Sequence, residues 1–159
     1  MDYKFCFHNT YKIEKSLEQL KISLEDLNKK KWYDFGINLK VELIGKRRFE
    51  FTPKISLGII NVMGLSQDFA LVYGEMREQD GQTCIELESR PNYALVFIFY
   101  CALFFPIIKY YYPSSFQSFE INSALILSSV TLPILFIMMI IPTLILRSRV
   151  ERFLGLSRF

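Results

Sequence analysis

The single histidine of the chain lies two residues from a cysteine. In an extended segment, Cys6 and His8 point to the same face, because side chains alternate along a strand. A thiol beside an imidazole is a pair used in nucleophilic catalysis and in metal binding. A metal site needs more ligands than these two, and Cys84 joins them only if the first and last strands are neighbours. We therefore interpret the pair as ordinary surface residues, and we expect no metal ion and no cofactor.

Carboxylates are the second candidate for chemistry. Glu86 and Glu88 share one face of a predicted strand, and Glu75 shares a face with Arg77. Acid–base catalysis needs a cleft that shifts the pKa of at least one such group, and the sequence indicates none. Phosphate-binding glycine-rich loops, serine-hydrolase turns and zinc-protease motifs are absent from the sequence. The pattern is typical of a solvated hairpin, so we expect no enzymatic activity and no catalytic residue.

Two basic clusters are candidates for contact with lipid headgroups. The first lies at a predicted turn and consists of Lys46, Arg47 and Arg48. The second follows the last apolar stretch and consists of Arg147, Arg149 and Arg152. Near an anionic leaflet, each basic residue contributes about 1 kcal/mol of attraction. The alternative for the first cluster is that its charges solvate a turn and discourage edge pairing.

The elements that position these residues fall into an apolar and a polar region. The apolar region contains Pro91–Ile108, of 18 residues, and Ile121–Leu146, of 26 residues, neither with a charged residue. A transmembrane helix needs about 20 mostly apolar residues. Lys109 and three tyrosines extend the first stretch to residue 112. The sequence therefore predicts a transmembrane helical hairpin with spans at 91–112 and 121–146.

Small residues in the second predicted span favour close helix packing. Ala124 and Ser128 have the small-x-x-x-small spacing that lets two helices approach, so we assign them to helix–helix packing. Neither Pro91–Ile108 nor Ile121–Leu146 contains an acidic or basic residue of the kind that lines an ion or proton path. The aromatic residues of the first span suit either lipid or a neighbouring membrane protein.

The polar region, residues 1–90, carries 14 Lys/Arg and 14 Asp/Glu, which is typical of a soluble domain. Alternation over Tyr3–His8 predicts a strand, and Asn9–Thr10 predict the start of a helix. That helix is amphipathic, with an apolar stripe formed by Ile13, Leu17, Leu20, Leu24 and Leu27. Alternation after Gly36, with turns at Gly45–Lys46 and Asp80–Gly81, predicts about four further strands in an antiparallel meander.

The predicted fold class is α+β, with a small antiparallel sheet of about five strands and one covering amphipathic helix, followed by the transmembrane hairpin. We expect a cytoplasmic domain at 1–90, the hairpin at 91–146 and a basic cytoplasmic tail at 147–159. The formal charge of the chain is +3, and the tail, with four Arg and one Glu, accounts for it. With no secretory signal in Met1–Asn38, the positive-inside rule places both termini in the cytoplasm. The expected location is the cell membrane, which is the inner membrane in a bacterium, with a multi-pass topology.

These expectations favour a non-catalytic accessory or scaffold subunit. Its hairpin would pack against a larger membrane protein complex or further copies of the chain, with anionic lipid and not nucleic acid as a further partner. One alternative is a stand-alone immunity or protective membrane protein. Another is a membrane-tethered ligand-sensing domain with a pocket between helix and sheet. A sensing pocket would require polar groups at the predicted core positions. These positions are instead apolar and suggest a filled core: Leu17, Leu20, Leu24, Leu39, Val41 and Leu43.

Overall fold

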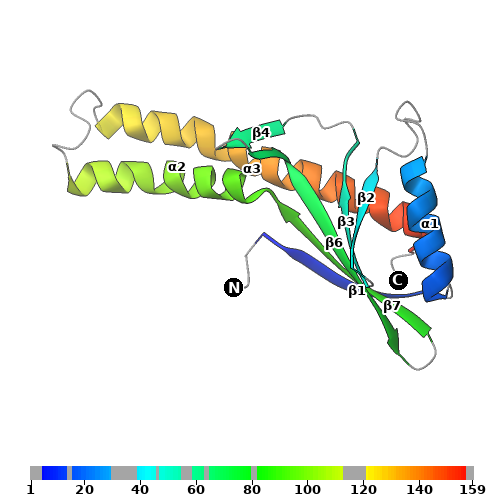
Figure 1. The fold of residues 1–159 in the computed structure, drawn as a ribbon. Helices are drawn as coiled ribbons and strands as arrows, with labels where there is room; N and C mark the ends of the chain where they lie inside the picture. Colours follow the sequence, from blue (N-terminus) through cyan, green and yellow to red (C-terminus); the bar gives the residue numbers. More distant parts are fainter. Residues whose placement is uncertain are drawn as a thin grey trace.

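The structure is a computed structural model that describes residues 5–13, 16–29, 39–45, 47–54, 59–62, 65–79, 82–112 and 121–156. The strands in these ranges are β1 (Phe7–Ile13), β2 (Lys40–Ile44), β3 (Arg48–Thr52), β4 (Ile59–Val62), β5 (Leu65–Asp68), β6 (Ala70–Gln79) and β7 (Gln82–Pro91). The helices are α1 (Leu17–Lys29), α2 (Tyr93–Tyr111) and α3 (Ile121–Leu154). The predicted α+β class and five-stranded antiparallel sheet are confirmed (Figure 1).

The strand order in the sheet is β1-β7-β6-β3-β2, and β4 and β5 form a separate pair. The first and last strands are therefore neighbours, with His8 opposite Glu88 and Ile13 opposite Thr83. A simple meander does not produce this order, because β1 returns to the sheet beside the strand farthest from it in sequence. The β6–β7 hairpin does follow the predicted turn, since Gln79 pairs with Gln82 around it. The turn residues Asp80–Gly81 lie outside the described residues.

The first helix begins later than predicted. Asn9–Thr10 do not start it, because β1 continues to Ile13 in its pairing with β7. The helix starts at Leu17 and is capped by Ser16. The Gln19 amide donates to Ser16 Oγ over 3.3 Å, and the Ser16 amide donates to Gln19 Oε1 over 3.2 Å. This reciprocal capping box satisfies backbone donors that the first helical turn leaves without partners.

The last helix extends beyond the predicted span. We predicted that a basic tail follows Leu146, but 147–154 continue α3 as one helix of 34 residues. Its C-terminal part runs along one face of the sheet (Figure 1). There Leu146, Val150 and Leu154 are buried in the main hydrophobic core. Their spacing of four residues places them on one side of the helix, which explains why the helix does not end where the charges begin.

The sheet is therefore covered mainly by α3, whereas α1 packs beside the edge strand β2. Asn28 fixes that edge, since its side chain donates to Val41 O over 2.6 Å and accepts from Val41 N over 3.1 Å. The predicted stripe on α1 is buried at Leu20, Leu24 and Leu27. Our expectation of one covering helix is thus corrected to two helices with different positions on the sheet.

The junction between β7 and α2 contains no linker, as predicted. β7 ends at Pro91, and Asn92 caps α2 by accepting from the Ala94 amide over 2.7 Å. The Asn92 side chain also donates to Asp68 O over 2.9 Å. Asn92 is buried, so the direction of α2 is tied to the sheet at this residue.

The α1 stripe supplies a stability test with a matched control. Leu24 is fully buried, whereas Ile22 on the same helix is 59% exposed. Leu24→Asp places a charge in the core and removes apolar contacts, so we expect a loss of more than about 4 kcal/mol in the free energy of unfolding. Ile22→Asp should cost less than about 1 kcal/mol. Thermal unfolding of the full chain in mild detergent measures both, and equal losses would show that the stripe is not core.

Candidate functional site

The largest exposed feature of the structure is the apolar surface of α2 and the adjacent part of α3. Both helices are long and apolar enough to cross a membrane, by length and composition. On α2, large hydrophobic side chains are exposed at Phe97, Ile98, Leu103, Phe104, Ile107 and Ile108. On α3, they are exposed at Leu125, Ile126, Leu127, Val130, Ile134, Phe136, Ile137, Ile141, Leu144 and Ile145. Monomeric soluble proteins rarely expose contiguous apolar patches above a few hundred Å² (about 300–600 Å² for the largest), so this surface is a candidate interaction site.

The two long helices contact each other through the residues assigned to packing. Ala124 and Ser128 are both buried on α3. Ser128 Oγ donates to the Ala102 carbonyl of α2 over 3.0 Å. Nearer the sheet, Leu95 of α2 packs with Leu135 and Met139 of α3 in a second hydrophobic cluster. The helices thus form an antiparallel pair that ends against the sheet.

Arg147, a predicted headgroup residue, has a different environment in the structure. Its side chain is 8% exposed, and its Nε donates to Glu151 Oε1 over 2.7 Å. Its Nη2 also donates to the Tyr11 hydroxyl over 3.3 Å, and that hydroxyl donates to Glu151. Burial opposes the charged form, but the hydrogen bonds to Glu151 and Tyr11 outweigh it and raise the pKa of Arg147. The guanidinium thus belongs to the seam between α3 and β1, and only Arg149 and Arg152 of this cluster are exposed.

The other predicted headgroup cluster lies away from the long helices. Arg47 and Arg48 are exposed at the start of β3, while Lys46 lies outside the described residues. The register of the sheet gives the distance from this cluster to α2. Arg48 pairs with Glu75 on β6. Glu75 lies five residues from Ala70, which is opposite Pro91 at the end of β7. At about 3.3 Å per strand residue, the cluster is about 17 Å along the sheet from the start of α2.

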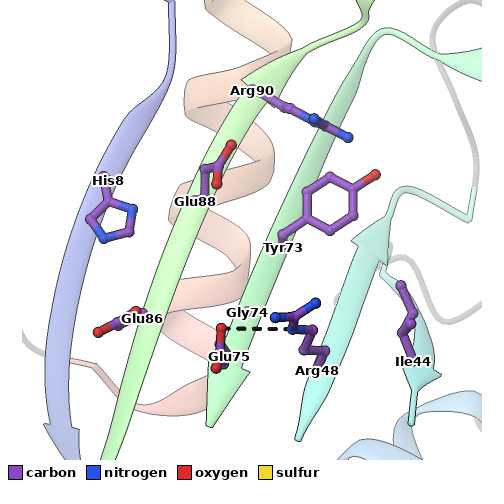
Figure 2. A pocket seen from close by; sticks show the side chains of 9 residues that line it. All are labelled: His8, Ile44, Arg48, Tyr73, Gly74, Glu75, Glu86, Glu88 and Arg90. Atoms are coloured by element: carbon purple, nitrogen blue, oxygen red, sulfur yellow. Dashed lines mark ion pairs between the residues drawn. The ribbon is translucent and has the colours of Figure 1, made fainter. Parts of the chain in front are cut away.

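The face of the sheet opposite α3 carries an open groove with a volume of about 400 Å³. Figure 2 shows α3 behind the strands and the groove residues in front of them. The groove is lined by His8, Ile44, Arg48, Tyr73, Gly74, Glu75, Glu86, Glu88 and Arg90. Its lining is rich in charged side chains of both signs, because this face alternates with the apolar face along each strand.

Ion pairs occupy the end of the groove far from α2. Arg77 pairs with Glu75 over 3.3 Å and with Glu86 over 3.2 Å, and Arg48 pairs with Glu75 over 3.7 Å. Glu75 and Glu86 are directly opposite each other on β6 and β7, where two like charges repel unless a cation bridges them. This network therefore joins Glu75 and Glu86 in cross-strand ion pairs.

At the end nearest α2, Arg90 contacts two tyrosine rings. Its guanidinium carbon is 4.3 Å from the centroid of Tyr73 and 4.3 Å from that of Tyr93. Burial raises the pKa of the Tyr73 phenol above its usual value, partly offset by Arg90, so the ring remains neutral at physiological pH. No periodic pattern along the chain indicates this arrangement, because it joins residues of β6, β7 and α2.

The cysteine and histidine candidates do not form a metal centre in the described part of the chain. His8 is exposed opposite Glu88, and Cys6 Sγ donates weakly to Glu88 Oε1 over 3.7 Å. Cys84 lies opposite Lys12 instead, four residues along β7 from Glu88. Although β1 and β7 are neighbours, no group of three His, Cys, Asp or Glu side chains among the described residues could hold a metal ion.

Comparison with known proteins yields no relationship: no protein-family model, curated protein or solved structure matches this chain. Two surfaces of the molecule itself are the candidates for function. The first is the apolar surface of the long helices. The second is the polar groove, which begins at the junction between the sheet and α2.

The buried ion pair makes a stability prediction with an internal control. Arg147→Met leaves the Glu151 carboxylate buried without its cation, so we expect a loss of about 3–5 kcal/mol. Arg147→Met combined with Glu151→Leu removes both charges and should recover most of that loss. Arg149→Met, on the exposed side of the same helix, should be neutral within about 0.5 kcal/mol. The free energy of unfolding of the full chain, measured in detergent, tests this. Equal losses for Arg147→Met and Arg149→Met would contradict the buried ion pair.

Proposed function

We propose that this chain is a non-catalytic accessory subunit of the membrane. In this proposal, α2 and the adjacent part of α3 cross the bilayer as a hairpin and pack against a larger membrane protein. The sheet then braces the cytoplasmic face of that partner. The observation that carries the proposal is the continuous, exposed apolar surface of two helices whose ends are fixed to a folded polar domain.

Helix length supports the membrane part of the proposal. α2 has 19 residues, which at about 1.5 Å per residue is close to the ~30 Å of a hydrocarbon core. The hydrogen bond from Ser128 to Ala102 aligns α3 antiparallel to α2, so a segment of α3 of about the same length lies beside α2. The remaining turns of α3 carry Arg147, Arg149 and Arg152 and lie along the sheet, outside the proposed core. Charges are therefore separated from the apolar surface along a single helix.

The fixed junction supports a bracing role. Phe5 and Phe69 of the domain pack with Leu95, Leu135 and Met139 of the helices in one cluster. The Phe5 and Phe99 rings are 5.8 Å apart in an edge-to-face contact. With Asn92 also buried at the junction, the domain has little freedom to rotate against the hairpin. A rigid element of this kind suits a structural subunit better than a tether.

The chemistry of the interior favours this proposal over ligand sensing between helix and sheet. The space between α3 and the sheet is filled by apolar side chains, including Phe49, Phe51 and Met76. The polar groove lies on the opposite face and is open. For orientation, exposed Arg149 and Arg152 at the domain end support a cytoplasmic domain and cytoplasmic termini under the positive-inside rule.

Cysteine labelling tests the membrane topology. Cys101 is exposed on α2, so every variant carries Cys101→Ser. In intact cells, a membrane-impermeant maleimide should label Ser115→Cys, between the two long helices, and should not label Thr10→Cys on the exposed side of β1. Thr10→Cys should react after the cells are opened. Labelling of Thr10→Cys alone in intact cells would reverse the topology, and extraction of the protein by alkaline carbonate would contradict membrane insertion.

Co-purification tests the accessory role. We expect the tagged chain in mild detergent to retain a membrane partner in stoichiometric amount, identified by mass spectrometry. Phe97 and Phe104 are seven residues apart on one side of α2 and are 69% and 50% exposed. Replacing both with Ala should reduce the retained partner and leave membrane insertion unchanged. Replacing Ile126 and Val130 with Ala tests whether α3 contributes to the same contact, in which case the retained partner should also decrease. A chain that purifies alone in every case, wild type included, would contradict the accessory role.

A further inference from the structure

In sequence, Arg90 is the charged residue nearest to the start of α2, and its guanidinium contacts two aromatic rings. The ring centroids of Tyr73 and Tyr93 each lie 4.3 Å from the guanidinium carbon, so cation–π contacts with both rings restrain the guanidinium. Its Nε is buried and has no hydrogen-bond partner among the residues that the structure describes. A guanidinium that is restrained in this way and has an unsatisfied donor suits the bidentate binding of phosphate.

The position of this stack relates it to the membrane, on the basis of the function proposed above. Arg90 is three residues before Tyr93, where α2 begins. If α2 spans the bilayer, the stack lies at the level of the headgroups, where tyrosine is enriched. The groove then opens directly at the membrane surface, with Arg90 at its membrane-proximal end.

The neighbouring acid decides which headgroup fits. Glu88 lies two residues before Arg90 on the same face of β7, about 7 Å away along the strand. Among the described residues it forms no ion pair, in contrast to Glu75 and Glu86, and it accepts only a weak bond from Cys6. A carboxylate beside the phosphate site repels a purely anionic headgroup. It attracts a headgroup that carries an ammonium group close to its phosphate.

We propose that Arg90 binds the phosphate of a membrane phospholipid and that Glu88 binds the primary ammonium of the same headgroup. Phosphatidylethanolamine has this chemistry, with a two-carbon chain between its phosphate and its ammonium. The trimethylated ammonium of phosphatidylcholine has no N–H to donate to Glu88, and phosphatidylglycerol has no cation. The membrane-proximal end of the groove thus selects one headgroup among phospholipids of equal chain length.

The experiment titrates the full chain in mild detergent with these three lipids, matched in acyl chains, and measures bound lipid by native mass spectrometry. We expect the wild-type chain to bind phosphatidylethanolamine about tenfold more tightly than phosphatidylcholine, as for a charge-assisted hydrogen bond. Glu88→Gln should remove that preference without weakening phosphatidylglycerol binding. Arg90→Gln should weaken all three, and Arg90→Lys, which keeps the charge without the fork, should weaken them less.

Arg77→Gln is the matched control, because it removes one positive charge from the same sheet face at the distal ion-pair network. It should leave the lipid preference unchanged. Equal binding of the three lipids by the wild-type chain, or equal losses from Arg77→Gln and Arg90→Gln, would overturn the proposal. Thermal unfolding of each variant separates loss of the site from loss of the fold.

Two further measurements identify which part fails. Soluble glycerophosphoethanolamine should bind far more weakly than the lipid, and binding as tight as the lipid would show that the site serves a soluble ligand. Flotation of the wild-type chain with vesicles tests insertion separately. A chain that floats without headgroup preference overturns the lipid site alone, whereas a chain that does not float overturns the proposed function.

Discussion

The continuity of α3 is the constraint on which the other features depend. One helix of 34 residues packs first against α2 and then along the sheet. Leu146, Val150 and Leu154 complete the core of the sheet, so the apolar face of the strands has no equivalent cover without this helix. The exposed apolar surface on the other part of α3 therefore belongs to the same continuous helix as this core. The environment that covers the hairpin consequently sets the position of the sheet, because the hairpin and the sheet cover are parts of one continuous helix.

A buried ionic network lies within this apolar seam. Arg147 and Glu151 contact Tyr11 of β1 through hydrogen bonds, in an interface otherwise formed by hydrophobic side chains. Such a network adds little net stability compared with apolar residues of the same size, because both charges lose their hydration. It does penalise other registers of the helix, since a shift of one turn moves the Arg147–Glu151 pair as a unit and breaks its hydrogen bonds to Tyr11. The network thus fixes how α3 lies on β1, and the packing of apolar side chains supplies most of the stability.

Local patterns predicted what is local in this fold. Alternation and turn residues located β2, β3, β6 and β7, and the apolar stretches located the two long helices. The pairing of β1 with β7 was not predictable, because it depends on the return of the first strand to the last. The end of α3 was misplaced for a physical reason: the charges at Arg147 and Glu151 indicated solvent, but they neutralise each other in the core. The groove was not predicted, because its residues come from separate strands. Lys46 of the first basic cluster lies outside the described residues.

The two faces of the sheet make different demands on their surroundings. The face against α3 is apolar and closed, so it contributes stability and leaves no room for a ligand. The open face is polar, and its charges differ along the strands. Far from α2, Arg48, Arg77, Glu75 and Glu86 compensate one another in cross-strand pairs, so this region needs no partner. Near α2, Arg90 contacts two tyrosine rings, and its Nε has no hydrogen-bond partner in the described part of the chain. Uncompensated polar groups thus lie beside the exposed apolar surface, where an amphiphilic molecule can satisfy both at once.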